Sequence, residues 1–297
     1  MCKKSSLAIF SFTLMLILSF LHLACKKKDL DSPSQHLAAL PEITTDSGHV
    51  MILILGGRFI MGSITGNADE AFTHEVSISP FALGKYEVTQ KFLDKLEYPN
   101  PSHFKGPDLP VEQIRWVEAA IYCNELSLSE GLELCYDEVT LQCNFDATGY
   151  RLPTEAEWEC AARADTETTY EFGKFPKNLK KYAYYADNSL KRTHRVGKKK
   201  SNRWGLFDMY GNVAEWCNDI YSENYYQQSL DDNPPGPKSG KKRILRGGSW
   251  DSSASACRSA ARAADIPGIV DACFARDTYG FRLARKLNQQ ELKMLSK

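Results

Sequence analysis

Short apolar runs broken by glycine set the main limit on what this chain can fold into. Segment 50–55 is apolar and β-prone, Gly56-Gly57 ends it, and 58–62 follows as a second short segment. Glycine pairs end strands and permit tight turns, so the two segments predict a β-hairpin. The sequence shows no repeat with a period of about 20–50 residues. We therefore expect an α+β fold with short strands rather than alternating βαβ units.

Two other segments predict helices. Residues 117–127 carry apolar side chains at helical spacing. Thr154 can cap a helix that starts at Glu155, because Glu157 stands where a capping box needs an acidic residue. Residues 165–204 show little periodicity and predict a long connection, and the stretch 231–240, which contains Pro and Gly, predicts a surface loop.

The first 25 residues have the arrangement of an export signal. Lys3 and Lys4 precede the apolar run 7–21, which is shorter than the roughly 20 residues that a membrane-spanning helix needs. Ala24-Cys25 resembles a bacterial lipobox, so Cys25 is the predicted lipidation site, with an ordinary secretory signal or a short membrane anchor as the alternative. We assign 1–25 to a lipoprotein signal peptide and the polar stretch 26–48 to a flexible tether.

The charge balance limits the class of partner. The 37 Lys and Arg residues equal the 37 Asp and Glu residues, so the formal net charge is zero. Chains that bind nucleic acid normally carry a surplus of basic residues. We therefore expect no nucleic-acid partner for this chain. The balance does not exclude a local basic patch.

The cysteines leave their pairing open. Of nine cysteines, setting aside Cys2 and Cys25 leaves seven, an odd number that cannot all pair within one chain. Export permits disulfides, and Cys135 and Cys143 are close enough in sequence to close a short loop. The alternative for most of these residues is a small buried hydrophobic side chain.

Four segments in a fixed order then point to one family. They are 56–63 (GGRFIMGS), 150–159 (YRLPTEAEWE), 205–216 (GLFDMYGNVAEW), and 246–250 (RGGSW) with 280–283 (GFRL), and 85–89 (KYEVT) also fits. In this order they resemble the formylglycine-generating-enzyme, or sulfatase-modifying-factor, family over 49–286, and leave 287–297 as a C-terminal tail. The resemblance implies a C-type-lectin-like fold. That fold also occurs without catalysis, so the site needs its own argument.

The resemblance implies specific metal chemistry for the family's enzymes. They use copper(I) held by two cysteines five positions apart, and copper(I), being soft, prefers thiolates. Cys257 matches one of the pair, but Ser252 stands at the other position, so we expect no copper site and no catalytic residue. Another branch is an iron-dependent sulfoxide synthase that needs a histidine cluster. The histidines after the signal are not paired at helical spacing: His36, His49, His74, His103 and His194.

The resemblance also implies a calcium site. By position, Asp208 and Glu215 would supply carboxylate oxygens, and Gly211 and Val213 would supply carbonyls, which suits a hard cation. The alternative is that Asp208 caps a turn and Glu215 pairs with an arginine. The sequence does not choose between the two.

Residues 251–285 use a restricted amino-acid alphabet. They contain no Lys, Glu, Gln, Met or Trp. A codon that starts as AAC or AAT and has both adenines randomised reaches every other amino acid, so this alphabet is typical of a cassette diversified by a retroelement. Fixed points would remain at 246–250, 257–259, Arg262, Pro267 and 280–284. The alternative is an ordinary irregular loop of a non-catalytic family member.

With the lipobox and the family domain, this cassette makes the chain similar to the variable surface lipoproteins of treponemes. The resemblance implies a variable region at about 246–285 that binds a ligand, expected to be a protein, on a chain anchored by lipid to the outer membrane at the cell surface. The alternatives are a fixed accessory lipoprotein of the same family and, less favoured, a copper-dependent oxidase. The predicted contact residues are Asp251, Ser252, Ser253, Ser255, Ala256, Ala261, Ala263, Ala264, Asp265, Ile266, Gly268, Ile269, Val270, Asp271, Ala272, Cys273, Phe274, Asp277, Thr278 and Tyr279.

Overall fold

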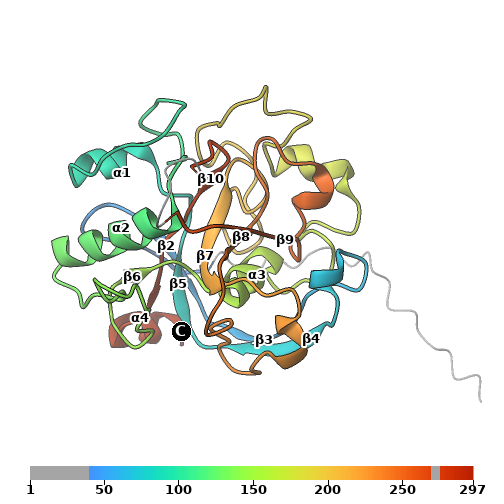
Figure 1. The fold of residues 1–297 in the computed structure, drawn as a ribbon, viewed down its shortest axis with the longest axis horizontal. Coiled ribbons are helices and arrows are strands. Elements are labelled where there is room, and N and C mark those ends of the chain that lie inside the picture. The colour runs from blue at the N-terminus through green and yellow to red at the C-terminus, as the bar shows by residue number, and fades with distance from the viewer. Residues whose placement is uncertain (1–39, 269–274, 297) are drawn as a thin grey trace, which may run out of the picture. The chain divides into compact units, whose positions relative to one another are not determined.

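Three sheets of short strands organise residues 40–268 and 275–296, the part of the chain that the computed structural model describes (Figure 1). One runs β1-β2-β5-β11-β6, with β1 (Glu42–Thr44), β2 (Val50–Ile54), β5 (Phe81–Gly84), β6 (Tyr150–Arg151) and β11 (Ala284–Lys286). The second runs β10-β7-β8-β9, with β7 (Ala214–Ile220), β8 (Arg243–Arg246), β9 (Arg262–Asp265) and β10 (Tyr279–Gly280). β3 (Gly57–Met61) pairs with β4 (His74–Ile78). The expected α+β class with short strands is confirmed.

Four α-helices accompany the sheets within these residues: α1 (Gln90–Lys95), α2 (Trp116–Ser129), α3 (Glu155–Arg163) and α4 (Gln289–Leu295). Short 3-10 turns lie at η1 (Ala68–Glu70), η2 (Pro176–Lys181), η3 (Tyr225–Gln228) and η4 (Ala254–Ala256). The predicted α2 and α3 are confirmed, and α3 begins at a capping box in which Thr154 Oγ1 accepts from the Glu157 amide at 3.1 Å. Within the described ranges, no helix has both the length and the apolar character needed to cross a bilayer.

The predicted hairpin of 50–55 with 58–62 is wrong. β2 pairs with β1 and β5, whereas β3 pairs with β4 in a separate sheet. Gly56 has a φ of +75°, and a Cβ atom there would lie 2.1 Å from the carbonyl oxygen of Ile78. The glycine pair is therefore a tight crossing from one sheet to the next, at a place where no side chain fits.

Both ends of the described domain extend past the predicted boundaries. β1 lies within the stretch 26–48 assigned to the tether, because Ile43 pairs with Met51 across the β1–β2 ladder. Residues 287–297, expected as a tail, include α4, which Asn288 caps. Arg285 of β11 forms an ion pair with Glu291 of α4, and both side chains are buried. These contacts hold α4 against the five-stranded sheet that contains β11.

The cysteines of the described residues are free thiols, including Cys135 and Cys143. Burial raises the pKa of Cys135 to about 11 and that of Cys143 to about 12. A neutral thiol in apolar surroundings behaves as a small hydrophobic side chain. Cys25 and Cys273 lie outside the described residues.

Candidate functional site

The four-stranded sheet has two chemically different faces. Its register aligns two cross-strand rows, Glu215–Arg246–Arg262 and Trp216–Leu245–Ala263. Successive residues of a strand point to opposite faces, so the charged row and the apolar row lie on opposite sides. The charged row faces α3, which lies beside β7 and β8 (Figure 1). The other side carries a pocket.

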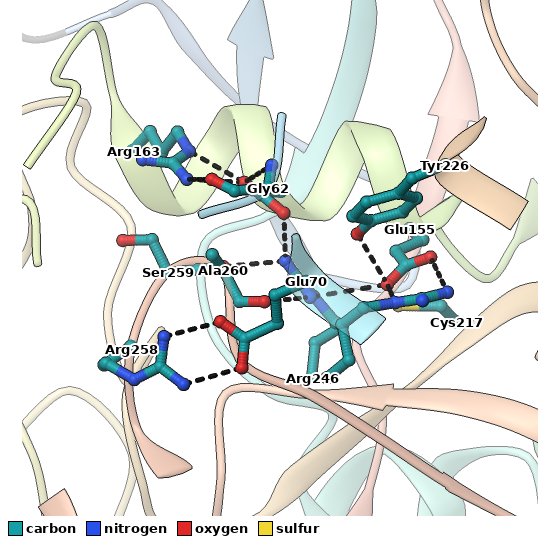
Figure 2. A network of polar contacts seen from close by, with 12 residues as sticks. Gly62, Glu70, Glu155, Arg163, Cys217, Tyr226, Arg246, Arg258, Ser259 and Ala260 are labelled. Atoms are coloured by element: carbon teal, nitrogen blue, oxygen red, sulfur yellow. Dashed lines mark hydrogen bonds and ion pairs between the residues drawn. The ribbon is translucent and has the colours of Figure 1, made fainter. Parts of the chain in front are cut away.

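Arg246 on the charged face ties the chain after residue 257 to α3. Its side chain is fully buried and pairs with Glu159 at 2.5 Å. It also donates to the backbone oxygens of Ser259 at 2.7 Å and Ala260 at 3.0 Å (Figure 2). Charge-assisted hydrogen bonds are strong where water is excluded, so this guanidinium fixes the position of the backbone at 259–260.

Two arginines within 251–285 are anchored in the same way. Arg262 donates to both carboxylate oxygens of Glu155, at 2.7 and 3.0 Å. Arg258 donates to both oxygens of Glu70, at 2.6 Å each, and Figure 2 shows this fork. Glu155 and Glu70 are buried, so losing Arg258 would leave the Glu70 carboxylate without a paired charge, and losing Arg262 would leave Glu155 with only the longer contact to Arg246, at 3.3 Å. Both arginines are positions that the sequence predicts to be fixed.

Cys257 and Ser259 complete the anchored set. Cys257 is fully buried in an apolar cluster with Tyr170, Tyr185 and Tyr210. The hydroxyl oxygens of Ser259 and Tyr210 are 2.9 Å apart. Cys257 and Ser259 therefore lie in the core of the domain, as do 260–262, whereas Ser255 and Ala256 just before them are exposed.

The residues at positions 252 and 257 do not fit a copper(I) pair. Ser252 Oγ accepts from the Ser249 amide at 2.9 Å and offers no thiolate. Burial raises the pKa of Cys257 to about 12, which favours the thiol over the thiolate that soft metals bind. Within 40–268 and 275–296, His, Cys, Asp and Glu side chains nowhere gather in a group of three that could hold a metal ion.

The four residues predicted to hold calcium are all buried: Asp208, Gly211, Val213 and Glu215. The Glu215 carboxylate accepts from Arg282 Nε and Nη2 at 2.5 Å each and from Trp158 Nε1 at 2.6 Å. Asp208 Oδ2 accepts from the Gly197 amide at 2.7 Å, and Oδ1 has no hydrogen-bond partner among the described residues. A guanidinium thus neutralises Glu215, so the set does not fit a calcium site that uses this carboxylate. The geometry fits the arginine-pair interpretation.

The apolar face of the sheet opens into a pocket of about 280 Å³. Its small lining residues are Ala214, Gly248, Ala256, Ala261 and Ala263, and its larger ones are Asn67, Leu245, Ser249, Asp251, Ser252, Arg262, Arg276, Thr278 and Tyr279. Small side chains over a sheet leave a hollow. The volume is near the lower end of small-molecule pockets, about 300 Å³.

One cluster at the edge of this pocket holds two parts of the chain together. Asp265, at the end of β9, accepts from Arg276 Nε at 3.1 Å and from the Tyr279 hydroxyl at 3.0 Å. Trp250 Nε1 donates to the Asp277 backbone oxygen at 2.8 Å. These bonds position the segment before β10 beside β9, so that both contribute to the pocket wall.

The predicted contact residues fall into four groups. Asp251, Ser253, Ser255, Ala256, Ala263 and Ile266 are exposed, and Ser252, Ala264, Asp265, Asp277, Thr278 and Tyr279 are half-buried. Ala261 and Gly268 are buried, although Ala261 still lines the pocket. At Gly268 a Cβ atom would lie 2.5 Å from Arg115 Cδ, so this position does not present a side chain to a ligand. Ile269, Val270, Asp271, Ala272, Cys273 and Phe274 lie outside the described residues.

Several pocket residues were not predicted. Arg276 belongs to the restricted segment, and the alphabet alone could have included it. Asn67, Ala214 and Leu245 come from distant parts of the chain and carry no sequence signal that links them to 251–285. Pairing of β7 and β8 with β9 brings Ala214 and Leu245 to the pocket, and Asn67 reaches it from the N-cap of η1.

The buried Asp219 on β7 should make stability depend on pH. Its Oδ2 accepts from the Glu155 amide at 2.8 Å. Burial, with the nearby Glu155 carboxylate, raises the pKa of Asp219 to about 8. A raised pKa means that the folded state holds the proton more tightly, so the stability that protonated Asp219 contributes is present at acidic pH and is lost as the pH rises through about 8.

Asp219→Asn is therefore expected to flatten the fall in the free energy of unfolding from acidic to mildly alkaline pH, as measured by urea titration. Asp146→Asn, which changes an exposed carboxylate, is the control and should keep the wild-type slope. A wild-type slope in Asp219→Asn would contradict the assignment.

Comparisons with known proteins agree with this fold. The sulfatase-modifying factor enzyme 1-like domain matches residues 37–287. The solved structure of Treponema denticola variable protein 1 superimposes with a TM-score of 0.76 at 33% identity, covering 83% of this chain and 99% of that one. The protein named chaperone protein LppX from Paenibacillus barcinonensis is 33% identical over 79% of this chain and 89% of its own length. An inactive C-alpha-formylglycine-generating enzyme 2 from Mus musculus is 28% identical over 79% of this chain and 85% of its own length.

The family thus includes proteins named as inactive as well as enzymes. The predicted family and fold are confirmed by the match over 37–287 and by the superposition on the Treponema denticola protein. The chain belongs to the sulfatase-modifying-factor, or formylglycine-generating-enzyme, family.

Proposed function

We propose that this chain is a variable surface lipoprotein that binds a protein ligand through the pocket on the apolar face of the four-stranded sheet. Its contact residues would include Asp251, Ala263 and Tyr279, which line the pocket. The exposed residues Ser253 and Ile266 would extend this surface. The family domain would act as a rigid scaffold, and a retroelement would change the side chains on it.

The observation that carries this proposal is the separation of anchored from open positions within 251–285. Cys257, Arg258, Ser259 and Arg262 each bond or pack onto the scaffold. Their neighbours Ser255, Ala256 and Ala263 are exposed. A segment built in this way can change its surface chemistry without losing the contacts that hold its backbone, as a diversified binding site requires.

A non-catalytic role follows from the same side chains. Ser252 supplies no thiolate where the family's copper site needs one, and Cys257 packs in the core. The similarity to proteins named as inactive family members supports this. Anchoring through Cys25 and display on the outer membrane rest on the lipobox-like sequence.

A second candidate is a fixed accessory lipoprotein with one constant partner. The similarity to the protein named chaperone protein LppX over most of its length favours it. In this case the pocket would hold one partner, and 251–285 would not vary.

Deep sequencing of the 3′ end of the gene in a growing population, with sequencing of the adjacent DNA, tests the proposal. We expect a near-copy of the segment for 246–285 with adenines at variable codons, beside a reverse-transcriptase gene. Substitutions should gather at exposed codons such as 251, 253 and 263 and spare 257–259 and Arg262. An invariant 3′ end without a template would reject diversification and favour the accessory role, whose partner crosslinking would identify.

A further inference from the structure

A second cavity, of about 330 Å³, shares no lining residue with the pocket on the four-stranded sheet, which is called the variable pocket below. Residues 48–50, Gly84 at the end of β5 and residues 86–89 form part of its lining. Lys91 and Phe92 of α1 and the loop residues Arg195 and Lys198 also line it. Phe92 stacks on His49 with ring centroids 3.7 Å apart, which gives the cavity an aromatic side.

The charges lining this cavity do not cancel. The cavity is lined by three cationic side chains, Lys91, Arg195 and Lys198, and by two carboxyl groups, of which Asp108 is half-buried and Glu87 is fully buried. Asp108 pairs with Arg195 and, at 3.4 Å, with Lys91. Lys198 forms no ion pair within the described residues. The lining side chains that reach solvent therefore carry about two positive charges in excess at neutral pH, which a phosphate dianion would balance.

The loop that carries two of these cations is held in place. The Val196 amide donates to the Asp108 backbone oxygen at 3.1 Å, and the Gly197 amide donates to Asp208 at 2.7 Å. Arg195 and Lys198 flank these anchored residues. Because the backbone is already ordered, the cost of positioning the cations for a ligand is reduced.

The inner lining carries little opposing charge. Burial lowers the pKa of His49 to about 3, so its ring favours the uncharged form. The two carboxyl oxygens of the buried Glu87 are occupied, because they accept from the Asn212 side chain at 2.6 Å and the Val213 amide at 3.0 Å. Thr89, which is buried, also lines the cavity, and its hydroxyl has no hydrogen-bond partner among the described residues. A buried hydroxyl without a partner is uncommon and is satisfied when a ligand oxygen reaches it.

We propose that this cavity binds a phosphoryl group, with Lys198 and Arg195 as its main contacts and the side of Phe92 against the group attached to it. The site is independent of the proposed function of the variable pocket. The phosphoryl group can come from a free phosphate compound or from the headgroup of an anionic lipid, and the chemistry at the protein is the same.

The test measures inorganic phosphate binding to the full chain in detergent by isothermal titration calorimetry, with ionic strength held constant by sodium chloride. Lys198→Ala is expected to weaken phosphate binding about tenfold, since a charge-assisted hydrogen bond is lost. Lys200→Ala removes an exposed lysine of the same loop that does not line the cavity, and should keep the wild-type affinity.

A second arm uses flotation with vesicles of phosphatidylcholine alone or mixed with phosphatidylglycerol, which shows whether a lipid headgroup is the source. Binding that prefers phosphatidylglycerol and is lost in Lys198→Ala but not in Lys200→Ala would support the site and assign it to a lipid. Equal losses in the two variants would reveal general surface charge and overturn the proposal. So would the absence of both saturable phosphate binding and any vesicle preference.

Discussion

Arg282→Ala is expected to lower the free energy of unfolding by about 3–5 kcal/mol, because it leaves a buried carboxylate without its partner. Arg282 is fully buried and forms two 2.5 Å hydrogen bonds to Glu215. It also donates to the backbone oxygens of Gly84 at 2.8 Å and Phe207 at 3.0 Å. One side chain thus holds β7, the end of β5 and the turn before Asp208 together.

The loss is measured by urea titration and by calorimetry, where roughly 2–4 °C per kcal/mol predicts a large fall in Tm. Arg58→Ala is the matched control. Arg58 also pairs with a glutamate, Glu75 at 2.9 Å, but both side chains are more than half exposed. Water screens such a pair, so the control should lose about 1 kcal/mol at most. Similar losses in the two variants would show that burial of the Arg282 pair does not govern its contribution.

A display library randomised at the open positions is expected to remain folded, whereas one randomised at the anchored positions should not. The open set is Asp251, Ser253, Ser255, Ala263 and Ile266, and the anchored set is Cys257, Arg258, Ser259, Arg262 and Arg282. Exposed substitutions usually change stability by about 0.5 kcal/mol or less. Breaking a buried ion pair costs about 3–5 kcal/mol, so several such changes exceed the total stability of a domain, about 5–15 kcal/mol. The measurement is the fraction of displayed variants that resist protease.

A third library separates a binding surface from a merely tolerant one. It randomises Gln289 and Lys293 of α4 and its C-cap residue Ser296, which are exposed and line neither the pocket on the four-stranded sheet nor the cavity beside α4. This library should also fold. Selection against a test protein such as lysozyme should recover binders from the open-position library alone, because only that one surrounds a pocket. Equal recovery from the α4 library would argue against a specialised binding surface.

Predictions from the sequence agree with the structure where a feature depends on residues close together in the chain. The capping box at Thr154 and Glu157 predicts the start of α3, because an N-cap needs only residues three apart. The restricted alphabet of 251–285 predicts where open positions lie, and Asp251, Ser253 and Ala263 are exposed. The alphabet cannot separate Gly268 or Ala261 from these, since it is a pattern of residue types and does not show which side chains reach the surface.

The sequence could not predict contacts between residues that lie far apart in the chain. The hairpin prediction at 50–62 is wrong because β2 and β3 each find their partners elsewhere, and Gly56 turns against the backbone of Ile78. The choice between calcium and an arginine at Glu215 stayed open because Arg282 lies 67 positions away. Neither feature leaves a local pattern.

Residues close together in the chain were enough to predict the family, the class of fold and the bounds of the segment with a restricted alphabet, because ordered motifs, capping signals and residue types are local properties of the sequence. The tertiary structure alone decided which of those residues share a surface. The pocket joins Ala214 and Leu245 to Ala263, and the pairing of β7, β8 and β9 places these three residues beside one another. A ligand meets side chains that are close in space, and spatial closeness is fixed by strand pairing and burial across the whole domain.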